Sequence, residues 1–72
     1  MSAATEIPTV RLANDIGAQF HHLPKDDAVR AIAQHLTMFW DPRMRTQLLA
    51  HVAAGGDGLD ELVIAAADTL RK

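Results

Sequence analysis

Apolar residues recur every three or four positions along most of the chain, which is the spacing of one face of an α-helix. Three interruptions divide this pattern: the stretch His22–Asp26 around a proline, the pair Asp41-Pro42, and the glycine-rich segment Gly55–Gly58. No segment alternates apolar and polar residues with period two, so no strand is expected. The pattern therefore predicts an all-α fold, a small bundle of four short helices around one core.

Start and stop signals place these helices along the chain. Asp41 can cap the helix that Pro42 opens, because proline fits a first helical turn where its missing donor is not needed. Asp57 or Gly58 is the expected cap of the last helix, and Gly55 suits a left-handed end to the helix before it. The predicted helices run from Pro8 to Phe20 or His21, from Asp26 or Asp27 to the break at Asp41, from Pro42 to Gly55-Gly56, and from about Leu59 to Arg71.

One apolar stripe on each helix supplies the expected core. Residues 1–7 are expected to be a frayed end, and residues 8–72 a single helical domain. Phe39 lies at the edge of its stripe, whereas Met38 and Ile64 lie off theirs. The expected core positions are Val10, Leu12, Ala13, Ile16, Gly17, Phe20, Val29, Ile32, Ala33, Leu36, Trp40, Met44, Leu48, Leu49, Val52, Leu59, Leu62, Val63, Ala66, Ala67 and Leu70.

Composition limits what this domain can be. The chain has 72 residues, of which 49% are hydrophobic and 22% charged, so it forms one globular domain at most. Because much of the apolar content is alanine, the core supplies little area, and self-association of the isolated chain is one expected consequence. Cysteine is absent, which excludes disulfides, thiolate zinc sites, Cys-ligated iron–sulfur clusters and a thiol nucleophile.

Other sequence features predict a soluble intracellular protein and argue against a membrane or general nucleic-acid partner. The first residues show no secretory signal, and no apolar run approaches the roughly 20 residues that span a bilayer. The net charge of −2 argues against general nucleic-acid binding, although a local basic patch remains compatible with it.

No set of residues has the spacing of a catalytic, cofactor or metal site. The four histidines form no His-x-x-x-His or Glu-x-x-His pair, and His21 and His22 are expected to end the first helix. The acidic pairs Asp26-Asp27 and Asp60-Glu61 belong in first helical turns, where acids stabilise the helix. We therefore expect a chain that is not itself an enzyme.

The segment Phe39–Arg45 is the most informative part of the chain. Two arginines, Arg43 and Arg45, occupy a predicted first helical turn, where the macrodipole disfavours cations. Trp40 precedes the break, and Trp and Arg are enriched at interface hot spots. Two interpretations stay open: Trp40 fills the core while Arg45 snorkels or pairs with Asp41, or the segment binds a partner. The candidate partner-binding residues are Met38, Phe39, Trp40, Arg43, Arg45 and Ile64.

At this point the chain resembles a known family, the delta subunit of bacterial NAD-dependent formate dehydrogenase. The resemblance rests on Phe39-Trp40-Asp41-Pro42-Arg43-Met44-Arg45 followed by Leu48-Leu49-Ala50-His51 and Ala54-Gly55-Gly56-Asp57-Gly58-Leu59, with Arg11-Leu12-Ala13-Asn14-Asp15-Ile16 and His35-Leu36 upstream. It covers roughly residues 10–70.

The resemblance implies a non-catalytic accessory subunit of a cytoplasmic enzyme that oxidises formate and reduces NAD. Pterin-bound molybdenum or tungsten, iron–sulfur clusters, flavin and NAD would belong to the larger subunits, with no cofactor in this chain. The chain would bind the large catalytic subunit and support assembly, stability or cofactor maturation. A small helical nucleic-acid-binding module and a self-associating bundle are the alternatives.

Overall fold

A computed structural model describes residues 8–71, and all of its regular structure is helical in this range. The model confirms the predicted all-α fold with four short helices. The expectation of a frayed segment at 1–7 lies outside the described residues, as does Lys72. The helices are α1 (Pro8–Gln19), α2 (Lys25–Phe39), α3 (Pro42–Ala53) and α4 (Glu61–Arg71).

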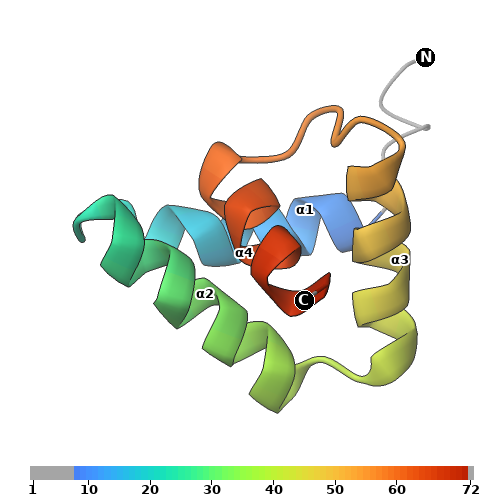
Figure 1. The fold of residues 1–72 in the computed structure, drawn as a ribbon, viewed down its shortest axis with the longest axis horizontal. Helices are drawn as coiled ribbons and strands as arrows, with labels where there is room; N and C mark the ends of the chain where they lie inside the picture. The colour runs from blue at the N-terminus through green and yellow to red at the C-terminus, as the bar shows by residue number, and fades with distance from the viewer. Residues whose placement is uncertain (1–7, 72) are drawn as a thin grey trace.

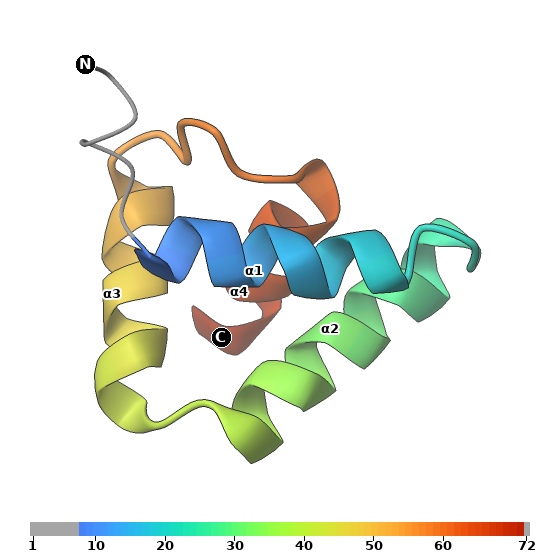
Figure 2. The same ribbon diagram turned by 180° about the vertical axis from the view of Figure 1, so that it is seen from behind.

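The first three helices form a triangle, and α4 packs across its middle (Figures 1 and 2). Helices α2 and α3 diverge from the turn that joins them, and α1 lies across their far ends (Figure 1). The turn between α2 and α3 therefore forms an outer corner of the molecule, on the side away from the loop that joins α3 to α4 (Figures 1 and 2).

The core lies where α4 meets the other helices. Its largest fully buried side chains are Ile32 and Leu36 from α2, Leu48 from α3 and Val63 from α4. Small residues let the central helix approach its neighbours closely; one of them is Ala66, which is fully buried. The buried core cluster consists of Val10, Ala13, Ile16, Ile32, Ala33, Leu36, Trp40, Leu48, Leu59, Val63, Ala66 and Ala67, all of them predicted from the helical pattern. Thr9 on α1 and Ala28 on α2 are buried as well, and neither was predicted.

Two helix boundaries were predicted correctly because the local signal decides them. Asp41 caps α3, with its Oδ1 accepting a hydrogen bond from the Met44 amide at 2.9 Å, and Pro42 opens the helix. At the other end, Gly56 has φ +67° and its amide donates to the carbonyl oxygen of His51 at 2.9 Å. This is the left-handed helix end that the glycine pair predicts.

Three other boundaries differ from the prediction. Helix α1 ends at Gln19, before Phe20, and α2 begins at Lys25, directly after Pro24. Helix α4 begins at Glu61, two residues later than predicted, because Asp60 rather than Asp57 or Gly58 caps it. The Leu62 amide donates to Asp60 Oδ1 at 2.9 Å.

One predicted core position is wrong: the Leu12 side chain is 46% exposed. Leu12 lies at the edge of the apolar stripe on α1, where the neighbouring helices no longer cover it. Periodicity alone does not show how far that cover extends. No helix within residues 8–71 combines the length and the apolar character needed to cross a membrane.

Candidate partner-binding surface

Trp40 is buried within the chain, at the point where α2 ends. Its relative exposure is 7%, and it belongs to the core cluster together with Leu36 and Leu48. The Trp40 amide donates to the carbonyl oxygen of Leu36 at 3.2 Å, which closes the last turn of α2. Of the two interpretations left open for this side chain, the structure shows the core position.

Arg45 binds the carboxyl end of α2 although it belongs to α3. Its Nη1 donates to the carbonyl oxygens of Leu36 and Thr37, each at 3.3 Å, and to that of Trp40. Carbonyl oxygens in the last turn of a helix have few or no amide donors within the helix, and they form the negative end of the macrodipole. The positive charge of Arg45 is unfavourable at the start of α3, and its contact with the negative end of α2 offsets this cost. The ion pair with Asp41 that the sequence allowed does not form.

Arg43 precedes Arg45 by two residues on α3 and is exposed. Within residues 8–71 it makes no hydrogen bond and no ion pair. Asp41, the nearest acid in the sequence, has its Oδ1 turned to the amide of Met44. Arg43 thus has no ion-pair partner within residues 8–71, and Asp41 serves as the cap of α3.

Met38 and Phe39 are the most exposed large apolar side chains of the described residues, at 65% and 69%. Met38 was placed off the core stripe by the sequence, and the structure agrees. Phe39 was placed at the edge of that stripe and instead turns outward, with its ring packed against the His35 ring at a centroid distance of 4.8 Å. Together with Arg43 they form the corner patch, defined here as Met38, Phe39 and Arg43.

Ile64 lies apart from this corner patch. It is half-buried on α4 and packs against the core cluster. Its Cδ1 would lie 3.0 Å from a Cβ built on Gly56, so it covers the turn that ends α3. Of the predicted surface, the structure leaves Met38, Phe39 and Arg43 exposed beside the turn between α2 and α3. It turns Trp40 and Arg45 inward and leaves Ile64 on α4, packed against the core.

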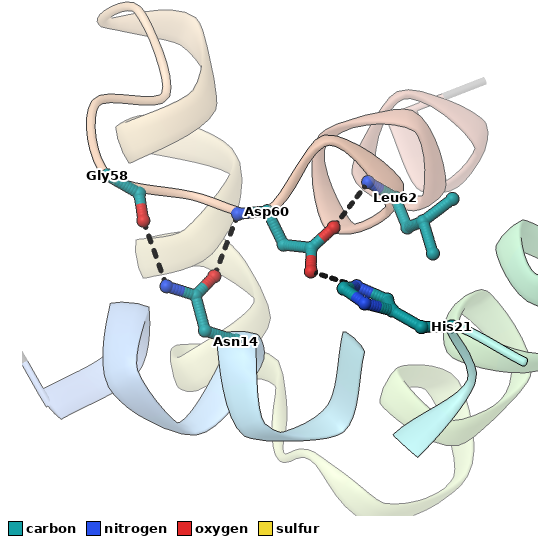
Figure 3. Close-up of polar contacts among 5 residues, drawn as sticks. All are labelled: Asn14, His21, Gly58, Asp60 and Leu62. Atoms are coloured by element: carbon teal, nitrogen blue, oxygen red, sulfur yellow. Dashed lines mark hydrogen bonds and ion pairs between the residues drawn. The ribbon is translucent and has the colours of Figure 1, made fainter. Parts of the chain in front are cut away.

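A second polar cluster joins α1 to the start of α4 (Figure 3). The Asn14 side chain donates to the carbonyl oxygen of Gly58 at 2.9 Å and accepts from the amide of Asp60 at 2.8 Å. Asp60 Oδ2 lies 2.5 Å from His21 Nε2, while its Oδ1 caps α4 at Leu62. All these groups therefore hold the loop before α4 against α1.

Sequence reasoning missed this cluster. Asn14 lies outside the predicted apolar stripe of its helix, and His21 was expected to end that helix. Instead His21 reaches across to the cap of α4. A polar residue that pairs with backbone more than 40 positions away leaves no periodic signal, so the pattern could not have revealed it.

Residues 8–71 contain no group of three or more His, Asp or Glu side chains arranged to hold a metal ion. An open hollow of about 620 Å³ lies between α1 and α3, lined by Pro8, Thr9, Gln47, Ala50 and His51. Its polar side chains already have partners: Thr9 Oγ1 donates to Gln47 Oε1 at 2.7 Å, and His51 Nε2 donates to the carbonyl oxygen of Asp57 at 2.7 Å.

These observations define the chain as a small helical module whose polar contacts serve its own fold and whose corner patch faces outward. A family model described as "NADH-dependant formate dehydrogenase delta subunit FdsD" matches residues 9–67. The chain belongs to this family, as the resemblance in the segment Phe39–Arg45 predicted. No curated protein and no solved structure matches the chain.

Proposed function

We propose that this chain is a non-catalytic accessory subunit that binds the large catalytic subunit of a formate dehydrogenase and supports its assembly, stability or cofactor maturation. The observation that carries the proposal is the family match over residues 9–67. The family description names a subunit of a larger enzyme, so a chain of this family works within a complex.

The chemistry of the chain supports the non-catalytic part of the proposal. Formate oxidation with NAD requires redox centres, and the resemblance implies pterin-bound molybdenum or tungsten, iron–sulfur clusters and flavin for the enzyme. The residues of this chain do not fit such groups: it has no cysteine to ligate a cluster, and residues 8–71 present no metal-ligand group. We propose that the cofactors and the NAD site belong to the partner subunits, as the resemblance implies.

The alternative of a nucleic-acid-binding module gains no support from the geometry. A recognition helix needs free basic side chains that reach phosphates and bases. Arg45 is engaged by three backbone carbonyls, which leaves Arg43 as the exposed arginine at the start of α3. One free arginine at the start of the candidate recognition helix, in a chain of net charge −2, is a weak basis for phosphate contacts.

Co-expression tests the proposal directly. The tagged chain is produced with the other formate dehydrogenase subunits, purified through its tag, and the eluate is assayed for formate-dependent NAD reduction. We expect the large subunit and the activity to elute with the chain, and the chain without its partners to show no turnover. Elution of the chain without the enzyme would refute the proposal.

The same system distinguishes the three supporting roles. Enzyme produced without the chain should contain fewer assembled complexes if the role is assembly, and complete complexes with a lower Tm if the role is stability. A maturation role predicts assembled enzyme with less metal and pterin per large subunit, which does not recover when the purified chain is added later.

A further inference from the structure

We propose that the corner patch, Met38, Phe39 and Arg43, is the docking surface of this chain, and that its occupant is a protein surface with an apolar pocket bordered by carboxylates. The inference rests on the proposed function for the identity of the partner, which is another subunit of the formate dehydrogenase. Beyond that function, the corner patch is the part of this chain that contacts the partner, and the contacted surface is apolar with carboxylates at its border.

Residues that stabilise the fold near the turn between α2 and α3 are different from those of the corner patch. Trp40 and Arg45 lie within the same short segment as the patch, and both make their contacts inside the chain. They fix the turn between α2 and α3 as a rigid corner. Met38 and Phe39 project from that corner at 65% and 69% exposure and contribute little to the core.

Exposed apolar side chains of this size are unfavourable in water unless something covers them. A single one is ordinary on a protein surface. Here two are adjacent, and the Phe39 ring is also backed by His35, which restricts its freedom before any partner arrives. An aromatic side chain held in this way loses less entropy on binding, which is the property of an interface anchor.

The charge of the patch decides which occupant fits. Arg45 is held by the carbonyls at the end of α2, and Asp41 Oδ1 accepts from the Met44 amide, so Arg43 is the charged group of this segment that has no bonding partner within residues 8–71. Arg43 has no acidic partner within residues 8–71 and stands at the positive end of α3. A carboxylate on the partner would satisfy it in bidentate geometry and would be favoured further by the helix dipole.

A second copy of the chain fits this patch poorly. In a twofold-symmetric dimer the same surface meets itself, so it must be self-complementary. The turn between α2 and α3 forms an outer corner of the ribbon (Figures 1 and 2). Self-pairing would also bring Arg43 and the positive end of α3 close to their own equivalents. Because like charges that face each other are unfavourable, a different protein is favoured over a second copy.

A matched pair of double variants tests the surface. Phe39→Ser with Arg43→Glu removes one exposed apolar side chain and reverses one charge at the corner. Leu12→Ser with Arg11→Glu makes the same two changes on α1, where both residues are also exposed. Each tagged chain is co-expressed with the other enzyme subunits, and the large subunit recovered per chain is measured after identical washes.

We expect the corner variant to retain at least tenfold less large subunit than the wild-type chain, and the α1 variant to retain a wild-type amount. Equal retention by the wild-type chain and the corner variant would refute the docking surface while leaving the proposed function intact. Failure of the wild-type chain itself to retain the enzyme would refute both. Helical content by circular dichroism verifies that the variants fold.

The carboxylate border has its own test. Arg43→Gln removes the charge and keeps much of the side chain, so association of the chain with the remaining subunits is compared at low and high ionic strength. Wild-type association should slow more steeply with added salt than that of the variant, because salt screens the attraction of Arg43. Equal slopes would refute the carboxylate border, and a dimer of the chain alone that the corner variant abolishes would show that a second copy is the occupant.

Discussion

Gly17 on α1 and Val63 on α4 approach so closely that a Cβ on Gly17 would lie 2.9 Å from Val63 Cγ2. The same Cβ would lie 3.2 Å from Asp60 Oδ2. Val63 is fully buried and its branched side chain has little freedom to move aside. The absence of a side chain at position 17 therefore sets how closely these two helices pack.

Gly17→Ala is accordingly expected to destabilise the fold despite the higher helix propensity of alanine. Propensity favours the change by about 1 kcal/mol, whereas overpacking a tight contact costs about 1–3 kcal/mol. Chemical denaturation measures the net effect. In a Val63→Ala background the shortest contact is relieved and the approach to Asp60 remains, so the same change should destabilise less. If it destabilises both backgrounds equally, the approach to Val63 is not the cause.

Arg45→Met is expected to destabilise the fold by about 1–3 kcal/mol, because it removes a charged donor from three carbonyls at the end of α2. Arg43→Met, two positions earlier on the same helix, is the matched control. It should change the free energy of unfolding by no more than about 0.5 kcal/mol, since Arg43 is exposed and makes no bond within residues 8–71. Equal effects in urea denaturation would contradict the roles given to the two arginines.

Asp60→Ala should destabilise the fold by about 0.5–2 kcal/mol through loss of the α4 cap, with a further contribution from the lost contact with His21. Asp57→Ala is the control, because the sequence alone marks Asp57 as an equally good cap and its side chain makes no capping bond. Thermal unfolding compares the two variants. If Asp57→Ala destabilises the fold more than Asp60→Ala, the assignment of Asp60 as the cap of α4 is wrong.

Trp40 fluorescence reports whether the partner contacts this side chain. Because Trp40 is 7% exposed in the chain alone, its accessibility to a dissolved quencher should be low and should change little when the enzyme subunits bind. Met38→Trp in a Trp40→Phe background places the only indole in the corner patch. That indole should be accessible in the free chain and protected in the complex, and protection of Trp40 instead would shift the interface toward the core side of the corner.

The sequence predicted the start of α3 and the end of the same helix because these features depend on neighbouring residues. Asp41 needs only the amide three residues later, and Gly56 needs only the backbone freedom that its missing side chain provides. The buried stripe followed for the same reason: helical periodicity fixes which side chains share a face. The family signature in Phe39–Arg45 is also local.

The prediction weakened where the relevant neighbour is distant in the sequence. The start of α4 was misplaced because Asp60 is held by Asn14 and His21, which no local rule connects to it. Leu12 and Phe39 were assigned to the core or its edge because a helical wheel gives the direction of a side chain and not the extent of its cover.

The sequence by itself determined the four helices, most of their core faces and the family, since each depends on residues within one or two helical turns or on their order along the chain. Only the tertiary structure decided between core and surface for the segment Phe39–Arg45. Packing of the four helices into one core buried Trp40, and the turn between α2 and α3 gave Arg45 the carbonyls of another helix. The same packing left Met38, Phe39 and Arg43 without partners at the corner, because burial and charge compensation depend on the whole set of neighbours in space.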